Sequence, residues 1–138
     1  AIPSCYYEDY RFDTEEMYHF VSRVININKE DLLHAEIVFL DNNQRINGSK
    51  LFEKYCEIRI NNDCVKKLRY FSNINQGEHD QHSLHINLVS LLPVLKTIGS
   101  NTFTLRKYFD KNAGFVTIFG ENEKYNMTFN MGLIKTDK

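Results

Sequence analysis

The stretch DTEEMYHFVSRV, residues 13–24, decides the fold because its pattern returns later in the chain as SLLPVLKTIG, residues 90–99. In both stretches apolar residues recur at positions i, i+3, i+4 and i+7, which is the spacing of one face of an amphipathic helix. These residues are Met17, Phe20, Val21 and Val24 in the first stretch, and Leu91, Val94, Leu95 and Ile98 in the second. We therefore expect two amphipathic helices, near Met17–Val24 and Leu91–Ile98.

Residues that start and stop helices flank both stretches. Asp13 and Glu16 have the spacing of a capping box, in which the first side chain accepts from free helix N–H groups and the second reaches back. The polar segment Asn26–Asp31 predicts the end of the first helix. Ser90 is the expected cap of the second helix, and Gly99 is its expected left-handed stop.

Short strands are expected around each helix, from alternation of apolar and polar residues. A strand near Cys5–Phe12 precedes the first helix, and one around Leu84–Leu88 precedes the second. The strands expected after the helices are Ala35–Leu40, Ile46–Phe52 and Tyr55–Ile60, then Thr102–Tyr108, Phe115–Phe119 and Tyr125–Met131. A helix followed by strands, shown twice, predicts one pseudo-symmetric α+β domain over residues 1–138, with two amphipathic helices packed on antiparallel sheets.

The segment after Ile60 predicts a single helical turn. Asp63 is placed to cap it, with Val65 and Leu68 directed inward. Lys66, Lys67 and Arg69 would then point outward as a short basic patch.

Composition narrows the class of protein. The 138 residues are 42% hydrophobic and 25% charged, as in ordinary globular domains. Seventeen basic and eighteen acidic side chains leave a formal charge of −1, so there is no general attraction to nucleic acid or to an anionic membrane. No apolar run approaches about 18 residues, and we expect no membrane partner.

Three cysteines, Cys5, Cys56 and Cys64, are an odd number without the spacing of a metal site. We expect reduced thiols in an intracellular protein, with Cys56 in a strand core. Glycosylation sequons at Asn47 and Asn126 leave a secreted protein open as the alternative.

The densest group of metal-ligand residue types is the run EHDQHSLH, residues 78–85. His79, His82 and Asp80 would converge on zinc if this loop curled. An extended chain instead sends them to opposite faces and leaves His85 pointing outward. No second cluster completes four ligands, so we predict no metal and no cofactor, with His79 and His82 as weak candidates.

Catalytic groups are not brought together by the sequence. Cys64 has no sequence link to His34 or His79 that would activate it as a nucleophile. The paired carboxylates Glu15 and Glu16 belong to a helix start, where solvated charges are expected. We predict that the protein is not an enzyme.

The order of strands and helices resembles a domain of the DNA sliding clamps, the family of PCNA and the DNA-damage checkpoint clamp. The matching motifs run from about Tyr55 to Met131. They are YCEI (55–58) with VKKL (65–68), LHINL (84–88) with LLPVLK (91–96), and TLR (104–106) with GFVTI (114–118).

This resemblance implies a function without catalysis. Clamp subunits close into a ring, thread duplex DNA through a channel lined by their helices, and tether replication, repair or checkpoint proteins. The implied partners are other clamp subunits or a second copy, client proteins, and duplex DNA without sequence specificity, in the nucleus. The resemblance implies that Arg23 and Lys96 face the channel, and it adds Lys29 and Lys66 as further candidates. The alternative is that all four are ordinary solvated charges on the surface.

Two other classes remain open. A self-associating β-sandwich head of an assembly scaffold would also close with strands such as Thr102–Phe129, and would not bind DNA. A secreted or viral protein-binding domain would use the sequons and a disulfide.

Overall fold

The computed structural model describes residues 7–40, 44–45, 52–72, 82–109, 113–120 and 127–136. Its two helices are α1 (Thr14–Asn28) and α2 (Leu88–Ile98). The strands are β1 (Tyr7–Asp13), β2 (His34–Phe39), β3 (Gln44–Arg45), β4 (Phe52–Ile60), β5 (Asp63–Tyr70), β6 (His82–Asn87), β7 (Thr102–Tyr108), β8 (Phe115–Gly120) and β9 (Thr128–Gly132). The α+β class expected from the sequence is confirmed.

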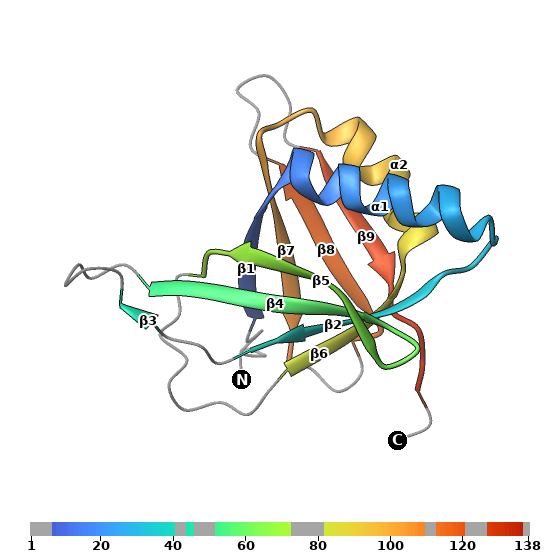
Figure 1. Ribbon diagram of the computed structural model, residues 1–138. Coiled ribbons are helices and arrows are strands. Elements are labelled where there is room, and N and C mark those ends of the chain that lie inside the picture. The colour runs from blue at the N-terminus through green and yellow to red at the C-terminus, as the bar shows by residue number, and fades with distance from the viewer. Residues whose placement is uncertain are drawn as a thin grey trace.

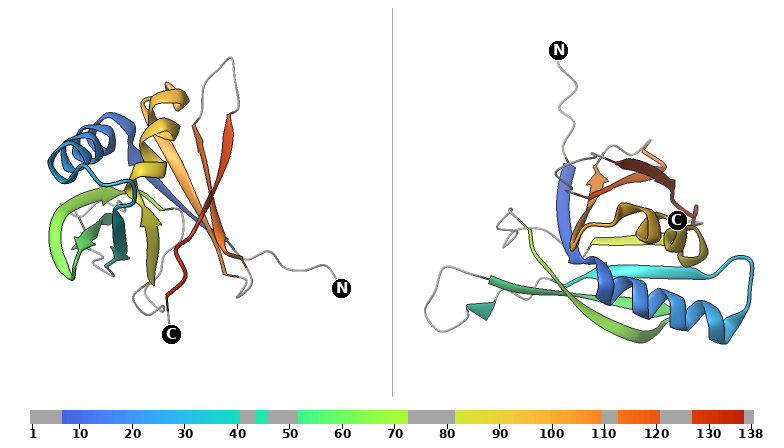
Figure 2. Two further views of the ribbon diagram at one scale, coloured as in Figure 1. Left: turned by 90° about the vertical axis from the view of Figure 1, so that its right-hand side faces the viewer. Right: turned by 90° about the horizontal axis from the view of Figure 1, so that it is seen from above.

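The strands form two antiparallel sheets whose connectivity is duplicated. One sheet has the order β1-β7-β8-β9, and the other has β6-β2-β4-β5, with the short β3 also paired to β4. Each half of the chain therefore runs strand, helix, strands, and the first strand of each half joins the sheet of the other half. The two helices lie beside each other on the same side of the molecule (Figures 1 and 2).

The duplication extends to single hydrogen bonds. Thr14, the first residue of α1, donates its N–H to the carbonyl of Asn101 at 2.9 Å, just before β7. Leu88, the first residue of α2, donates its N–H to the carbonyl of Leu33 at 2.9 Å, just before β2. Each helix start is thus anchored to the strand that follows the other helix, which ties the two halves together.

The two sheets also join at corresponding edges. Arg11 and Phe71 exchange two backbone hydrogen bonds, of 2.8 and 2.9 Å, between β1 and the end of β5. In the other half, the N–H of Ile134 donates to the carbonyl of His85 on β6 at 2.8 Å. Arg11 and His85 each lie two residues before their helix cap, so these contacts are equivalent.

The core lies between the sheets and beneath the helices. Tyr10 on β1 stacks on Phe39 on β2, with ring centroids 3.8 Å apart, so the two sheets interlock through aromatic rings. Phe12 stacks on Phe103 within the first sheet at 5.4 Å. The expected helix faces supply the rest of the core, because Met17, Phe20, Val21, Leu91, Leu95 and Ile98 are all buried. Val94 is only half-buried at the edge of the core.

The helix boundaries were partly right. Asp13 caps α1 by accepting from the N–H of Glu16 at 2.8 Å, as expected. The helix does not break at Asn26 but continues to Asn28, and Lys29 ends it in the left-handed conformation. Ser90 is not the cap of α2; Asn87 caps it, so the helix begins before the expected start, and Gly99 ends it with a φ of 65°.

The helical turn expected after Ile60 is wrong, because this segment is strand β5. Asn61 and Asn62 both have positive φ, 53° and 69°, which is the geometry of a two-residue hairpin turn. The turn pairs β5 with β4, burying Leu68 and leaving Val65 45% exposed. Asparagine tolerates this conformation better than most residues do.

The remaining expected strands are confirmed within the described ranges, except Ile46–Phe52, of which only Phe52 is described and belongs to β4. β2 is central, between β4 and β6, as its sequence predicted, but only one of its faces is wholly apolar, because the other carries His34 and Glu36 beside the buried Val38. Residues 5–6, 46–51 and 125–126, which belong to three expected strands, lie outside the described residues. In the part of the chain that the structure describes, neither helix is long and apolar enough to span a membrane.

Candidate functional site

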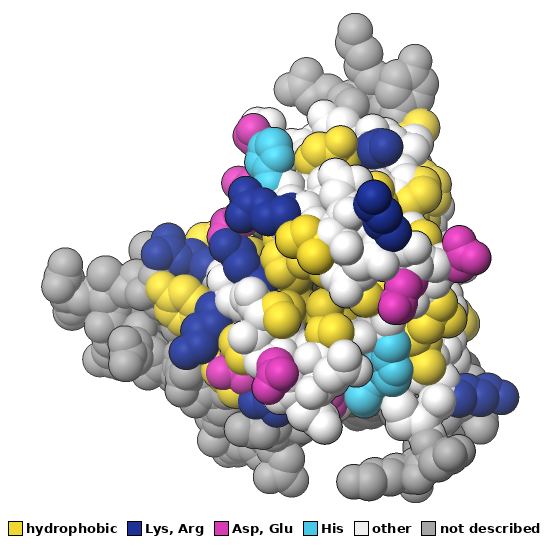
Figure 3. Space-filling view, turned by 45° about the vertical axis from the view of Figure 1, so that its right-hand side comes forward, with side chains coloured by type: hydrophobic (Ala, Val, Ile, Leu, Met, Phe, Trp, Pro, Cys, Tyr) yellow, Lys and Arg dark blue, Asp and Glu magenta, His cyan; other side chains and the backbone are white. Residues whose placement is uncertain are grey.

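The paired helices carry the basic residues implied by the resemblance. Arg23 is exposed on α1, and Lys29 is exposed at its end, about 9 Å farther along the helix axis. Lys96 is exposed in the last turn of α2, and Lys66 is half-buried on β5. In Figure 3, several Lys and Arg side chains lie near one another on the left of the face shown, beside hydrophobic side chains that reach the surface, and other Lys and Arg side chains lie apart on the right.

Arg23 and Lys66 come together in a groove between α1 and β5. The groove has a volume of about 320 Å³, and its lining is Glu16, His19, Phe20, Arg23, Val24, Ile27, Val65 and Lys66. Two basic side chains, Arg23 and Lys66, share this groove with one carboxylate, Glu16, so the groove favours an anion. This convergence depends on β5 being a strand, because only the hairpin brings Lys66 back to α1.

Lys96 lies in a different groove, between the start of α1 and the end of α2. Its volume is about 490 Å³, and its lining is Asp13, Thr14, Glu15, Tyr18, Leu95, Lys96, Gly99, Ser100 and Asn101. Two carboxylates, Asp13 and Glu15, face the single ammonium group of Lys96. The local charge is therefore negative, and this groove is the poorer site for a phosphate.

Several apolar side chains are exposed near the end of α1. Ile27 is 73% exposed, Leu32 is 56% exposed and Val65 is 45% exposed. Ile27 and Val65 line the same groove as Arg23 and Lys66. That groove therefore combines cations with apolar surface.

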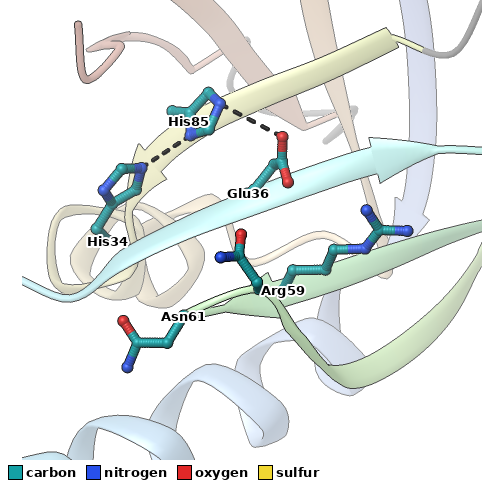
Figure 4. A pocket seen from close by; sticks show the side chains of 6 residues that line it. His34, Glu36, Arg59, Asn61 and His85 are labelled. Atoms are coloured by element: carbon teal, nitrogen blue, oxygen red, sulfur yellow. Dashed lines mark hydrogen bonds and ion pairs between the residues drawn. The ribbon is translucent and has the colours of Figure 1, made fainter. Parts of the chain in front are cut away.

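The structure also assembles a histidine cluster that the sequence did not reveal. Nε2 of His34 lies 2.8 Å from Nδ1 of His85, and Nε2 of His85 lies 3.4 Å from a carboxylate oxygen of Glu36 (Figure 4). His34 and Glu36 come from β2, and His85 comes from β6. The three groups thus form a chain of carboxylate, imidazole and imidazole along the solvent-facing side of the sheet.

Strand register creates this chain. Glu36 is directly opposite His85 in the antiparallel pair, and His34 is opposite Asn87, two residues farther along. Residues two apart on a strand share a face, so His34 reaches His85 diagonally. The expectation that His85 points outward agrees with its half-buried position.

The histidines line a pocket of about 230 Å³ together with Glu36, Arg59, Asn61 and Asn62. Arg59 donates two hydrogen bonds to one oxygen of Glu57, at 2.6 and 2.9 Å, and this pairing raises the pKa of its guanidinium group. The positive charge of Arg59 is therefore largely compensated by Glu57. The Asn61–Asn62 turn brings the two amides to the pocket edge.

The burial of the two described cysteines follows from their positions in the strands. Cys56 is fully buried in β4, and burial raises the pKa of its thiol to about 12. Cys64 is exposed near the start of β5, and both thiols are free. Cys5 lies outside the described residues.

The structure does not test the metal candidates of the sequence. His79 and Asp80 lie outside the described residues, as does the side chain of His82. Within the described ranges, no group of three or more His, Cys, Asp or Glu residues is arranged to hold a metal ion.

Comparison with known proteins adds no family. Neither the protein-family models, nor the curated proteins, nor the solved structures gave a match to this chain.

Proposed function

We propose that this chain is a non-enzymatic, DNA-associated scaffold, a subunit or domain of a sliding-clamp-type ring in DNA replication, repair or checkpoint signalling. The observation that carries the proposal is the duplicated connectivity, with each first strand exchanged into the other sheet and both helices on one side. The resemblance to the clamp family rests on this order of strands and helices and on the motifs between about Tyr55 and Met131.

The charge on the helix side supports contact with a phosphate backbone. Arg23 and Lys66 share a groove in which cations outnumber carboxylates, and Lys29 lies at the end of the same helix. Such contacts do not depend on base sequence and weaken as salt increases. Lys96 is the weakest of the four candidates because Asp13 and Glu15 share its groove.

The sheet edges support assembly with further subunits. Among the described strands, β5 forms a ladder only with β4 and meets β1 just past its end, and β9 forms a ladder only with β8 and is followed by the contact of Ile134 with β6. An edge strand offers backbone N–H and C=O groups to another chain. A second copy or a related subunit that adds a strand at either edge would extend the assembly toward a ring.

The test is binding of a fluorescent DNA duplex over a salt series. Reversing the charge at both Arg23 and Lys66 (Arg23→Glu, Lys66→Glu) should weaken binding and lower the slope of log K against log salt by about 2. The matched control is Lys67→Glu with Lys135→Glu, which makes the same charge change at two exposed positions elsewhere. Equal salt slopes for the two double variants would remove this groove from the DNA interface.

A self-associating scaffold head is the second candidate, favoured by aromatic exposure on the β1-β7-β8-β9 sheet. Tyr7 is 43% exposed and Phe115 is 40% exposed, and both lie near Tyr108. Light scattering over a concentration series, with and without duplex, separates the two functions. A dimer that forms with concentration and ignores DNA would favour the head domain over the clamp.

A further inference from the structure

We infer that His34 and His85 form a binding site for a divalent transition metal of the zinc type, with Glu36 orienting His85 from behind. Zinc and related ions bind neutral imidazole nitrogen, and two such nitrogens here face each other across 2.8 Å. The site is separate from the proposed DNA groove, so the inference does not depend on the clamp function.

The contact between His85 and Glu36 determines which nitrogen is available. A carboxylate at 3.4 Å favours a proton on Nε2 of His85, which leaves the lone pair on Nδ1. That lone pair points toward His34, as the two dashed contacts in Figure 4 show. Metal-binding histidines very often donate their second N–H to a carboxylate in this way, which orients the ring and increases its basicity.

Without metal, the N–H of His34 donates to Nδ1 of His85. With metal, His34 instead carries its proton on Nδ1, so that both facing nitrogens present lone pairs to the ion. No net proton leaves the neutral histidines in this exchange.

Binding the ion requires the two rings to separate and turn. Two nitrogens bound to tetrahedral zinc at about 2.0–2.1 Å lie about 3.3 Å apart, so the nitrogens must separate by roughly half an ångström, and the ring of His34 must turn so that both lone pairs meet at the ion. The side chain of His34 is exposed and can move by this amount without disturbing the core.

The surroundings suit a cation with open coordination positions. Glu36 supplies negative charge behind the ring of His85, while the charge of Arg59 is compensated by Glu57. The pocket of about 230 Å³ has room for several waters, each of which occupies about 30 Å³. Glu36 contacts Nε2 of His85 and is therefore not itself a ligand. The protein ligands are Nε2 of His34 and Nδ1 of His85, and water or a partner's side chain completes the coordination.

The experiment is calorimetric titration of the full chain with ZnCl₂, together with NMR spectra of the histidine ring nitrogens. One ion should bind per chain, and Nε2 of His34 and Nδ1 of His85 should be the nitrogens whose signals shift. His34→Ala or His85→Ala should weaken binding at least tenfold, and Glu36→Gln should weaken it about tenfold. His19→Ala is the matched control, because His19 is an exposed histidine on α1 that pairs with the carboxylate of Glu15 and lies apart from this pocket.

The NMR measurement uses the unmodified chain, so the test does not depend on the folding of any variant. Ring signals of His34 and His85 that stay unchanged at saturating zinc would overturn the inference. So would zinc binding that survives both alanine variants but is lost in a His79→Ala, His82→Ala double variant.

Discussion

Leu33 donates its backbone N–H to the side-chain oxygen of Asn87 at 2.8 Å, and the same oxygen accepts from the N–H of Val89 at 3.1 Å. One side chain therefore caps α2 and also holds the entry of β2. The first helix lacks this double role, since the side chain of Asp13 accepts only from Glu16 within the described part of the chain. The two caps are equivalent in the duplicated fold but differ in what they stabilise.

Replacing Asn87 by alanine should lower the free energy of unfolding by about 2–4 kcal/mol. The lost helix cap accounts for about 1 kcal/mol, and the part-buried N–H of Leu33 left without its acceptor accounts for a further 1–3 kcal/mol. Asp13→Ala should lose only the cap, about 1 kcal/mol. Urea unfolding of both variants measures the difference, and equal losses would show that the bond to Leu33 contributes nothing.

Two leucine-to-alanine changes test the packing of α2. Leu91 is 1% exposed within the core, and Leu91→Ala should lower the free energy of unfolding by about 2–5 kcal/mol. Leu32 is 56% exposed, and Leu32→Ala should change it by no more than about 0.5 kcal/mol. Thermal or urea unfolding compares them, and similar values would mean that α2 is not packed against the core.

Gly120 and Gly132 test the contact between α2 and the first sheet. A Cβ at Gly120 would lie 2.2 Å from Oγ of Ser100 and 2.3 Å from Cγ2 of Ile98, whereas a Cβ at Gly132 would meet no atom within 4 Å. Gly120→Ala should therefore destabilise the fold by about 1–3 kcal/mol. Gly132→Ala should be neutral or slightly stabilising, since alanine restricts the unfolded chain. Urea unfolding measures both variants, and an equal change in the free energy of unfolding would contradict the close approach of Ser100 and Ile98 to Gly120.

Burial of Cys56 predicts a loss of stability at high pH. Its thiol has a pKa of about 12 when folded, raised mainly by desolvation from an ordinary value of 9.0. Above pH 9 the unfolded state loses this proton and the folded state keeps it, so unfolding becomes more favourable as pH rises toward 12. The slope is about 1.4 kcal/mol per pH unit for one such group.

The pH effect is measured by urea unfolding between pH 8 and 10.5, with Cys56→Val as the reference that lacks the thiol. Above pH 9, the free energy of unfolding of the unmodified chain should fall relative to that of Cys56→Val. Parallel pH profiles would indicate that the thiol ionises as easily in the folded state as in the unfolded one.

Local patterns were sufficient for the helices and most strands. The stripes that include Met17 and Leu95 predicted buried helix faces because residues three and four apart meet on one side of a helix. The same reasoning failed at Asp63–Tyr70, where Val65 and Leu68 happen to have helical spacing. The turn at Asn61 and Asn62 was the signal that was missed, since positive φ at both residues favours a hairpin.

The candidate sites depended on contacts between distant residues. His34 and His85 are 51 residues apart in sequence, and their approach follows from the register of β2 against β6. Arg23 and Lys66 were both predicted as basic candidates, but their shared groove required β5 to fold back along α1.

The sequence by itself determined an α+β chain with two amphipathic helices, the cap at Asp13, the stop at Gly99 and the buried place of Cys56. These features depend on hydrophobic periodicity and on backbone preferences within a few neighbouring residues. Only the tertiary structure decided the exchange of β1 and β6 between the sheets, the histidine chain ending at Glu36, and the division of the basic residues between two grooves. Strand register and packing are selected by the total burial of the whole chain, which no local stretch of sequence contains.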